Sequence, residues 1–294
     1  MPRVRANGID IEYETFGDPS AAPLLLIMGL GAQLISWDEP FCRELAGRGF
    51  RVIRFDNRDS GLSTRMEEAG VPDIAEVLGG QHKPAYMLDD LAADAAGLLE
   101  SLDIEAAHVV GASMGGFIAQ LVALNHPEKV LTLTSIMSGP GGLDATPPRP
   151  EGAAVLTLDP ASTREGRIAQ GASIRRVLIG PGDAFDENAE VARATRAVDR
   201  AYYPPGTARQ LAAILVASGR VDRLRSVRVP TLVIHGDADV LVPIENGRTV
   251  AAAVPGARLI EIEGMGHDLP KRVWTQVIDA ITELAKQAAP TRRR

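Results

Sequence analysis

Residues 109–126 read VVGASMGGFIAQLVALNH. The stretch begins with β-branched residues that are typical of a buried strand, and it continues with apolar residues at helical spacing. Ser113 stands between the two halves, with glycine at positions 111, 115 and 116. A strand that turns into a helix over one residue strains that residue, and neighbouring side chains would clash across the turn. The pattern therefore predicts a strand, a tight turn at Ser113 and a helix, with the hydroxyl raised above a sheet. An N-cap serine after a glycine-rich turn is the alternative interpretation.

The rest of the chain alternates strand-like and helix-like segments. Strands are expected at 9–16, 23–29, 50–56, 104–113, 130–138, 229–236 and 257–264. Helices are expected at 37–49, 87–103, 114–128, 244–254 and 272–287. This alternation predicts an α/β fold with a mostly parallel, doubly wound sheet.

The alternation of strand-like and helix-like segments is interrupted after Ser138. Residues 139–228 contain a stretch rich in glycine and proline, followed by helix-like segments at 164–180, 187–203 and 207–219, with no strand-like segment between them. Such an insertion is much longer than an ordinary connection. We therefore expect a core domain made of residues 1–138 and 229–294, with residues 139–228 forming an inserted helical lid.

Composition limits the function classes. The 294 residues are 45% hydrophobic and carry a net charge of -7, which suits one large globular domain and argues against nucleic-acid or anionic-membrane partners. The terminal TRRR is expected to be a solvated tail. With one cysteine, no signal-like start and no apolar run long enough to span a bilayer, a cytoplasmic protein is expected. The composition is compatible with a monomer or a homodimer.

A serine hydroxyl needs a base within hydrogen-bond reach before it can act as a nucleophile. His267 follows the strand expected at 257–264 and lies on a loop, between Gly266 and Asp268. Parallel sheets build their sites from loops after the carboxyl ends of strands, so we expect His267 to be the base. His235 also ends a strand, but its ring is expected to pack against a neighbour.

A carboxylate should fix the tautomer of the histidine and stabilise its charged form. The segment GDADVLVP at 236–243 offers Asp237 and Asp239. We expect Asp239 to be the acid, because it occupies the fourth position of G-x-x-D-x-x-x-P, and we interpret Asp237 as the residue of an Asx turn. Asp144, after the preceding strand, is a substitute.

At this point the chain resembles α/β-hydrolase fold serine hydrolases over nearly its whole length, with the order Ser113, Asp239, His267. The matching stretches are PLLLIMGLG (23–31), RVIRFDNRDSGLST (51–64), VVGASMGGFIAQLVALNHPEKV (109–130), PTLVIHGDADVLVP (230–243) and EIEGMGHDLP (261–270). Within the family it is most similar to bacterial esterases of the aclacinomycin methylesterase type. The resemblance implies an oxyanion hole formed by the backbone N–H groups of Leu30 and Met114. Most of the family has His-Gly where this chain has Met28-Gly29, a change that leaves backbone donors in place.

The resemblance also implies an activity: hydrolysis of a small-molecule carboxylic ester through an acyl-enzyme, with a methyl ester of a polyketide-like molecule as one substrate class. C–C bond hydrolases, lactonases, perhydrolases and acyltransferases use the same triad. A ligand-binding receptor without turnover is the alternative from another class. No cofactor is expected, because the sequence has no metal-ligand spacing and no phosphate-binding loop.

Four aromatic residues are candidates for an apolar substrate pocket. They are Trp37, Phe41, Tyr202 and Tyr203. Aromatic side chains at such positions also serve as ordinary core residues, which is the alternative for each of them.

Overall fold

The centre of the molecule is one eight-stranded sheet, seen in a computed structural model that describes residues 2–288. The strand order is β1-β2-β4-β3-β5-β6-β7-β8. β2 pairs antiparallel with β1 and β4, and every later pair is parallel. The strands are β1 (Arg3–Ala6), β2 (Ile9–Phe16), β3 (Ala22–Ile27), β4 (Phe50–Phe55), β5 (Ala107–Ala112), β6 (Val130–Ile136), β7 (Thr231–Gly236) and β8 (Arg258–Ile262). The mostly parallel α/β sheet predicted from the sequence is confirmed. The terminal TRRR lies outside the described residues.

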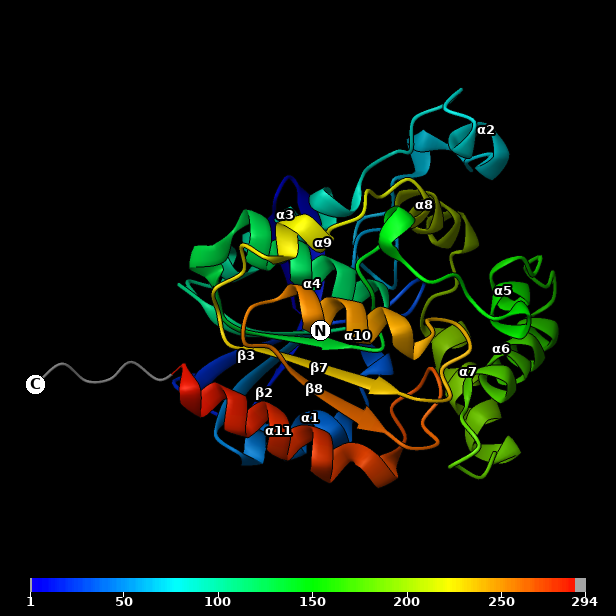
Figure 1. Cartoon of the computed structure of the whole chain (residues 1–294). Helices are drawn as coiled ribbons and strands as arrows, with labels where there is room; N and C mark the ends of the chain where they lie inside the picture. Colours follow the sequence, from blue (N-terminus) through cyan, green and yellow to red (C-terminus); the bar gives the residue numbers. More distant parts are fainter. Residues whose placement is uncertain (1, 289–294) are drawn as a thin grey trace, which may run out of the picture.

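Helices cover both faces of the sheet (Figure 1). One face carries α1 (Glu39–Gly47) and α11 (Trp274–Gln287), and the other carries α3 (Leu88–Ser101), α4 (Met114–Asn125) and α10 (Ile244–Ala253). All five lie where the apolar periodicity predicted helices, with ends that differ by a few residues.

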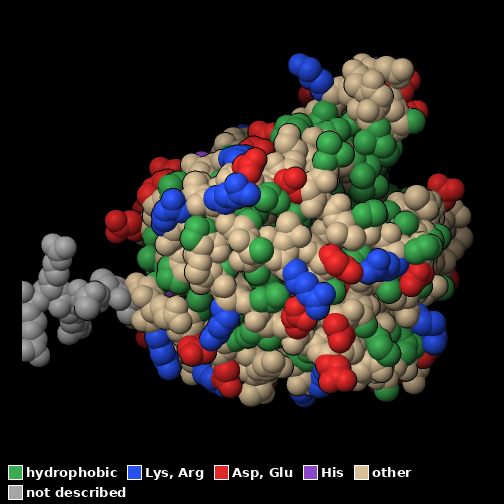
Figure 2. All heavy atoms as spheres, viewed as in Figure 1, with side chains coloured by type: hydrophobic (Ala, Val, Ile, Leu, Met, Phe, Trp, Pro, Cys, Tyr) green, Lys and Arg blue, Asp and Glu red, His purple; other side chains and the backbone are tan. Residues whose placement is uncertain are grey.

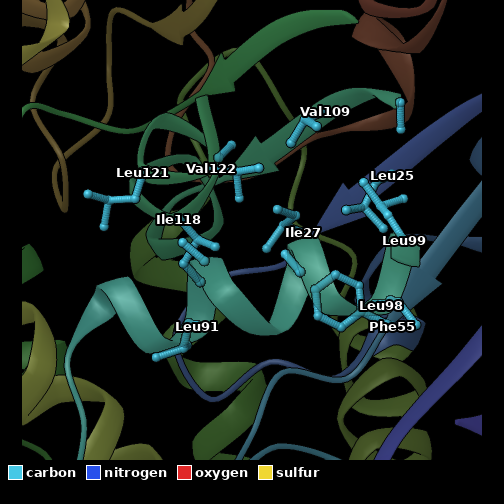
Figure 3. Close-up of a cluster of buried hydrophobic side chains, with 14 of the residues drawn as sticks. Leu25, Ile27, Phe55, Leu91, Leu98, Leu99, Val109, Ile118, Leu121 and Val122 are labelled. Atoms are coloured by element: carbon cyan, nitrogen blue, oxygen red, sulfur yellow. The ribbon is translucent and has the colours of Figure 1, made fainter. Parts of the chain in front are cut away.

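The core follows from this layering. Side chains along a strand point alternately to the two faces, so a strand covered on both faces needs a continuous apolar run. In β3, Leu25 and Ile27 belong to the cluster under α3 and α4, whereas Leu24 and Leu26 belong to the cluster under α1 and α11. Figure 3 shows the first cluster, in which β3, β4 and β5 meet the two helices.

The segment between β6 and β7 contains helices and, in the part of the chain described, no strand. The helices are α5 (Pro150–Leu156), α6 (Arg164–Leu178), α7 (Glu187–Arg200), α8 (Pro204–Leu215) and α9 (Val221–Leu224). In Figure 1, α5, α6 and α7 lie beyond the arrowheads of β7 and β8, at the carboxyl edge of the sheet. We expected α7 to run to Tyr203 and α8 to start at 207. The helix boundary falls earlier because Pro204 favours an extended residue before it and suits the first turn of a helix.

A short helix, α2 (Ile74–Leu78), projects from the body of the molecule (Figures 1 and 2). This helix was not predicted from the sequence. Asp73 caps it by accepting hydrogen bonds from the N–H groups of Ala75 and Glu76. On the face in Figure 2, acidic and basic side chains are interspersed. Among residues 2–288, no helix has the length and hydropathy that crossing a membrane requires.

Candidate active site

Ser113 occupies the single-residue turn between β5 and α4. Its backbone has φ 57° and ψ -124°, which is the strained region that the sequence pattern predicted. The glycines are required by close backbone contacts: a Cβ on Gly111 would lie 2.0 Å from the Gly115 carbonyl oxygen, and one on Gly115 would lie 2.1 Å from that of Ile27. Ser113 is the N-cap residue of α4 by position, but its side chain makes no capping hydrogen bond, so the N-cap alternative does not explain the hydroxyl.

The hydroxyl of Ser113 lies beside His267, which is on the loop after β8. Ser113 Oγ is 2.9 Å from His267 Nε2, and His267 Nδ1 is 2.7 Å from Asp239 Oδ2. The His267 side chain is 7% exposed and that of Asp239 is fully buried. Three loops at the carboxyl edge of the sheet thus bring together an alcohol, an imidazole and a carboxylate in series.

The carboxylate of Asp239 is held by its own turn. Oδ1 accepts hydrogen bonds from the backbone N–H groups of Leu241 (2.9 Å) and Val242 (2.8 Å), which leaves Oδ2 for His267. This is an Asx turn, which we had expected at Asp237. The carboxylate of Asp237 instead accepts a hydrogen bond from the N–H of Gly264 at 2.7 Å, so that expectation is wrong.

A second imidazole approaches the same carboxylate. His235 Nε2 is 2.7 Å from the carbonyl oxygen of Val242 and 3.5 Å from Asp239 Oδ2. Burial alone would raise the pKa of Asp239, but the charge interaction with His267 and hydrogen bonds from His235 and His267 hold that pKa below its usual range. The expectation that the His235 ring packs against a neighbour is confirmed, but its contact with Asp239 was not predicted. His235 lies in β7 and Asp239 in the loop after it, and a spacing of four residues indicates contact only within a helix, so the sequence held no signal for this contact.

The helical segment between β6 and β7 contacts the loop that carries His267. The backbone N–H of His267 donates to the carbonyl oxygen of Leu178, at the end of α6, at 2.8 Å. Next to it, Asp268 Oδ2 lies 3.4 Å from Arg175 Nη2 of the same helix. Burial raises the pKa of Asp268, against the lowering effect of Arg175.

Asp144, the substitute acid, instead accepts a hydrogen bond from the N–H of Val221 at 3.1 Å.

The two expected oxyanion donors flank Ser113. Gly29 lies against the serine, since a Cβ there would be 3.0 Å from Ser113 Cβ and 3.3 Å from Oγ. Leu30 follows it, and Met114 is the first residue of α4, where N–H groups have no partner within the helix. Within residues 2–288, neither of these two N–H groups donates to another protein atom.

The four aromatic candidates fall into two pairs. Trp37 and Phe41 are each 1% exposed; their rings stack at 5.8 Å, and Phe41 also contacts Trp274. This burial favours core packing over pocket lining. Tyr202 and Tyr203 are partly exposed between α7 and α8, each beneath an arginine guanidinium, and pocket lining by them stays a prediction.

No group of three or more His, Cys, Asp or Glu side chains among the described residues is arranged to hold a metal ion.

A mostly parallel eight-stranded sheet, with a strained serine on the turn after a central strand and a histidine on the loop after the last, is the architecture of the α/β hydrolases. The alpha/beta hydrolase fold family matches residues 22–270, and the chain belongs to this family. This confirms the fold and family expected from the resemblance.

Individual relatives agree with this assignment. The chain is 34% identical to rhodomycin D methylesterase DauP of Streptomyces sp. (strain C5), and the match covers 95% of each sequence. Among solved structures, a meta-cleavage product hydrolase from Pseudomonas fluorescens IP01 has a TM-score of 0.78 at 19% identity, covering 98% of both chains. The enol-lactonase from Burkholderia xenovorans LB400 has a TM-score of 0.71 at 24% identity, covering 98% of this chain and 99% of that one. These two structures share the fold.

Proposed function

We propose that this protein is a serine hydrolase that cleaves carboxylic esters, with Ser113 as nucleophile, His267 as base and Asp239 as acid. The observation that carries the proposal is the pair of hydrogen bonds from Ser113 Oγ to His267 Nε2 (2.9 Å) and from His267 Nδ1 to Asp239 Oδ2 (2.7 Å). An ionised carboxylate only accepts hydrogen bonds. Nδ1 therefore carries the proton of a neutral His267, and Nε2 has a lone pair free to accept the proton of the serine.

The reaction then takes two steps. Ser113 Oγ attacks the acyl carbon as His267 Nε2 takes the hydroxyl proton, and the imidazolium returns that proton to the leaving alkoxide, releasing an alcohol. Water then attacks the acyl-enzyme while His267 Nε2 takes a proton from the water. The imidazolium gives that proton to Ser113 Oγ as the bond between Oγ and the acyl carbon breaks and the carboxylic acid leaves. The buried charge of Asp239 stabilises the imidazolium in both steps.

The N–H groups of Leu30 and Met114 are the proposed donors to the oxyanion of each tetrahedral intermediate. Both are free to donate and both belong to residues next to the contact between Gly29 and Ser113. Fixed donors aimed at a developing negative charge are among the largest contributions to enzymatic catalysis. The positive end of the α4 dipole, which begins at Met114, acts in the same direction.

The substrate we propose is a small-molecule ester, with a methyl ester of a polyketide-like molecule as the first candidate. Its support is the 34% identity, over 95% of both sequences, to a relative named rhodomycin D methylesterase. We further propose that residues 139–228 form a lid over the site, because the end of α6 contacts the loop of His267.

The test is a ranking of kcat/KM over a panel of carboxylic esters, lactones and β-diketones, with wild-type protein and Ser113→Ala. We expect esters to rank first and Ser113→Ala to abolish their turnover. Faster cleavage of diketones or lactones would indicate C–C hydrolysis or lactonase activity, and transfer to peroxide or an added alcohol would indicate a perhydrolase or an acyltransferase. Binding without turnover of any compound would indicate a receptor and contradict the proposal.

A further inference from the structure

The side chain of Gln210, on α8 of the inserted segment, is fully buried and makes three hydrogen bonds. Oε1 accepts from the backbone N–H of Gly31 at 2.8 Å. Nε2 donates to the carbonyl oxygen of Arg58 at 2.7 Å and to Ser60 Oγ at 3.0 Å. Gln210 therefore joins two loops of the core, the one after β3 and the one after β4.

The loop after β3 contains the proposed oxyanion donor, the N–H of Leu30. This N–H belongs to the peptide group whose carbonyl oxygen is that of Gly29, which accepts from the N–H of Ala32 at 3.2 Å. The preceding peptide is fixed because Asn57 Nδ2 donates to the carbonyl oxygen of Met28 at 2.9 Å. The following peptide is fixed because its N–H, that of Gly31, donates to Gln210. Peptide groups are planar, so anchors on both sides restrict the direction of the Leu30 N–H.

The contact between α8 and this loop is close. Gly31 has φ +64°, and a Cβ on it would lie 2.7 Å from Thr207 Oγ1 of α8. One residue from Gln210, Arg209 forms a buried ion pair with Asp59. The inserted segment is thus fixed to the core directly behind the loop that carries Leu30.

We propose that Gln210 and Asn57 are positioning residues for the oxyanion hole, holding the Leu30 N–H toward the oxygen that becomes negative in the transition state. The inference rests on the proposed serine hydrolase function. It gives the stretch DNRDS at 56–60 a role, since this stretch supplies Asn57 and the two acceptors that orient Gln210. It also makes α8 a part of the catalytic framework.

The test compares wild type with Gln210→Met, which keeps the length of the side chain but loses its hydrogen bonds. Three quantities are measured: kcat and KM for p-nitrophenyl acetate, the pH profile of kcat/KM, and the inhibition constant of a trifluoromethyl ketone, whose adduct carries an oxyanion. We expect kcat to fall by about 10- to 100-fold with little change in KM, because complete loss of one oxyanion donor costs about 10²- to 10³-fold. Affinity for the ketone should fall in parallel.

A structural defect near the triad gives a different pattern. Gln210 makes no hydrogen bond to His267 or Asp239, so we expect the acid limb of the pH profile to stay in place. The matched control is Gln170→Met on α6, because Gln170 also bonds two backbone groups, accepting from Ala161 N–H at 3.1 Å and donating to the Asp159 carbonyl oxygen at 2.7 Å. This control should match wild type in all three measurements.

The inference is overturned if folded Gln210→Met keeps wild-type kcat and ketone affinity, or if kcat falls while ketone affinity is unchanged. A displaced acid limb would also overturn it, because the defect would then lie in the triad. If Gln210→Met does not fold, the same measurements on Asn57→Leu test the inference. We expect the same result: a lower kcat, weaker binding of the ketone, little change in KM and an unchanged acid limb. Failure of the proposed function is distinguishable, since wild type would then show no turnover that depends on Ser113.

Discussion

Asp59 and Arg209 lie 150 positions apart in the chain and form a two-point ion pair inside the protein. Arg209 Nη2 is 2.7 Å from Asp59 Oδ1, and Arg209 Nε is 2.8 Å from Asp59 Oδ2. The side chain of Arg209 is 1% exposed and that of Asp59 is 0% exposed. Burial alone would raise the pKa of Asp59, but hydrogen bonds from Arg209, Met66 N–H and Tyr86 hold it below its usual value. The pair connects α8, in the helical segment between β6 and β7, to the loop after β4.

Removing one residue of this ion pair should therefore destabilise the folded protein. We expect Arg209→Met to lower the free energy of unfolding by about 3–5 kcal/mol, because it leaves the carboxylate of Asp59 buried without its cation. Urea denaturation measures the change. The control is Arg164→Met, which removes the same side chain from an exposed two-point pair with Asp199 and should cause no measurable loss. Equal stability of the two variants would contradict a structural role for the buried pair.

His108 should make stability depend on pH. Its ring is buried on β5, with Nδ1 2.9 Å from Thr132 Oγ1, and burial lowers the pKa of His108 from 6.5 to about 4. Between these two pH values the unfolded chain binds a proton that the folded protein does not, so stability falls as pH falls. The loss should approach about 3 kcal/mol near pH 4, at about 1.4 kcal/mol for each pKa unit.

Urea denaturation from pH 7.5 to pH 4 tests this effect. His108→Gln, which keeps a hydrogen-bonding group near Thr132, should lose less stability over this range than wild type. His82→Gln, on an exposed loop, should follow wild type. Parallel curves for wild type and His108→Gln would show that His108 does not produce the pH dependence.

The role of Asp239 can be tested by changing its charge while keeping its shape. Asp239→Asn should lower kcat for p-nitrophenyl acetate by about 10⁴-fold, because an amide in this place favours the wrong tautomer of His267. Asp237→Asn is the matched control, two residues away on the same loop. Its amide oxygen still accepts from the Gly264 N–H, and its activity should equal that of wild type. Similar activity in the two variants would remove Asp239 from the mechanism.

Local patterns predicted much of this molecule. The apolar runs at 23–29 and 229–236 predicted buried strands because a parallel strand contacts helices on both faces. The glycines around Ser113 predicted the strained turn, because only residues without a side chain fit there. Asp239 and His267 were predicted to be partners of Ser113 from their positions after strands, and the fold brings both side chains to the edge of the sheet where Ser113 lies. Their catalytic roles stay a proposal.

The features that sequence reasoning missed depend on contacts between distant segments. Gln210 lies in a helix with an ordinary amphipathic pattern, and nothing in its neighbours indicates that its amide reaches Gly31, Arg58 and Ser60. Asp59 and Arg209 are 150 positions apart. No local spacing pattern in the sequence therefore indicates that they pair. The assignment of the Asx turn to Asp237 was wrong because both aspartates of the loop can form such a turn, and the strand end alone does not distinguish them.

The most direct measurement of the central claim is covalent labelling with a fluorophosphonate, followed by peptide mass spectrometry. An activated serine attacks the phosphorus and displaces fluoride, so the account predicts one adduct per chain, located on Ser113. The adduct should be absent in Ser113→Ala and form far more slowly in His267→Gln, because the base is lost. Absence of labelling in folded wild type, or labelling of another residue at an undiminished rate in Ser113→Ala, would contradict the account.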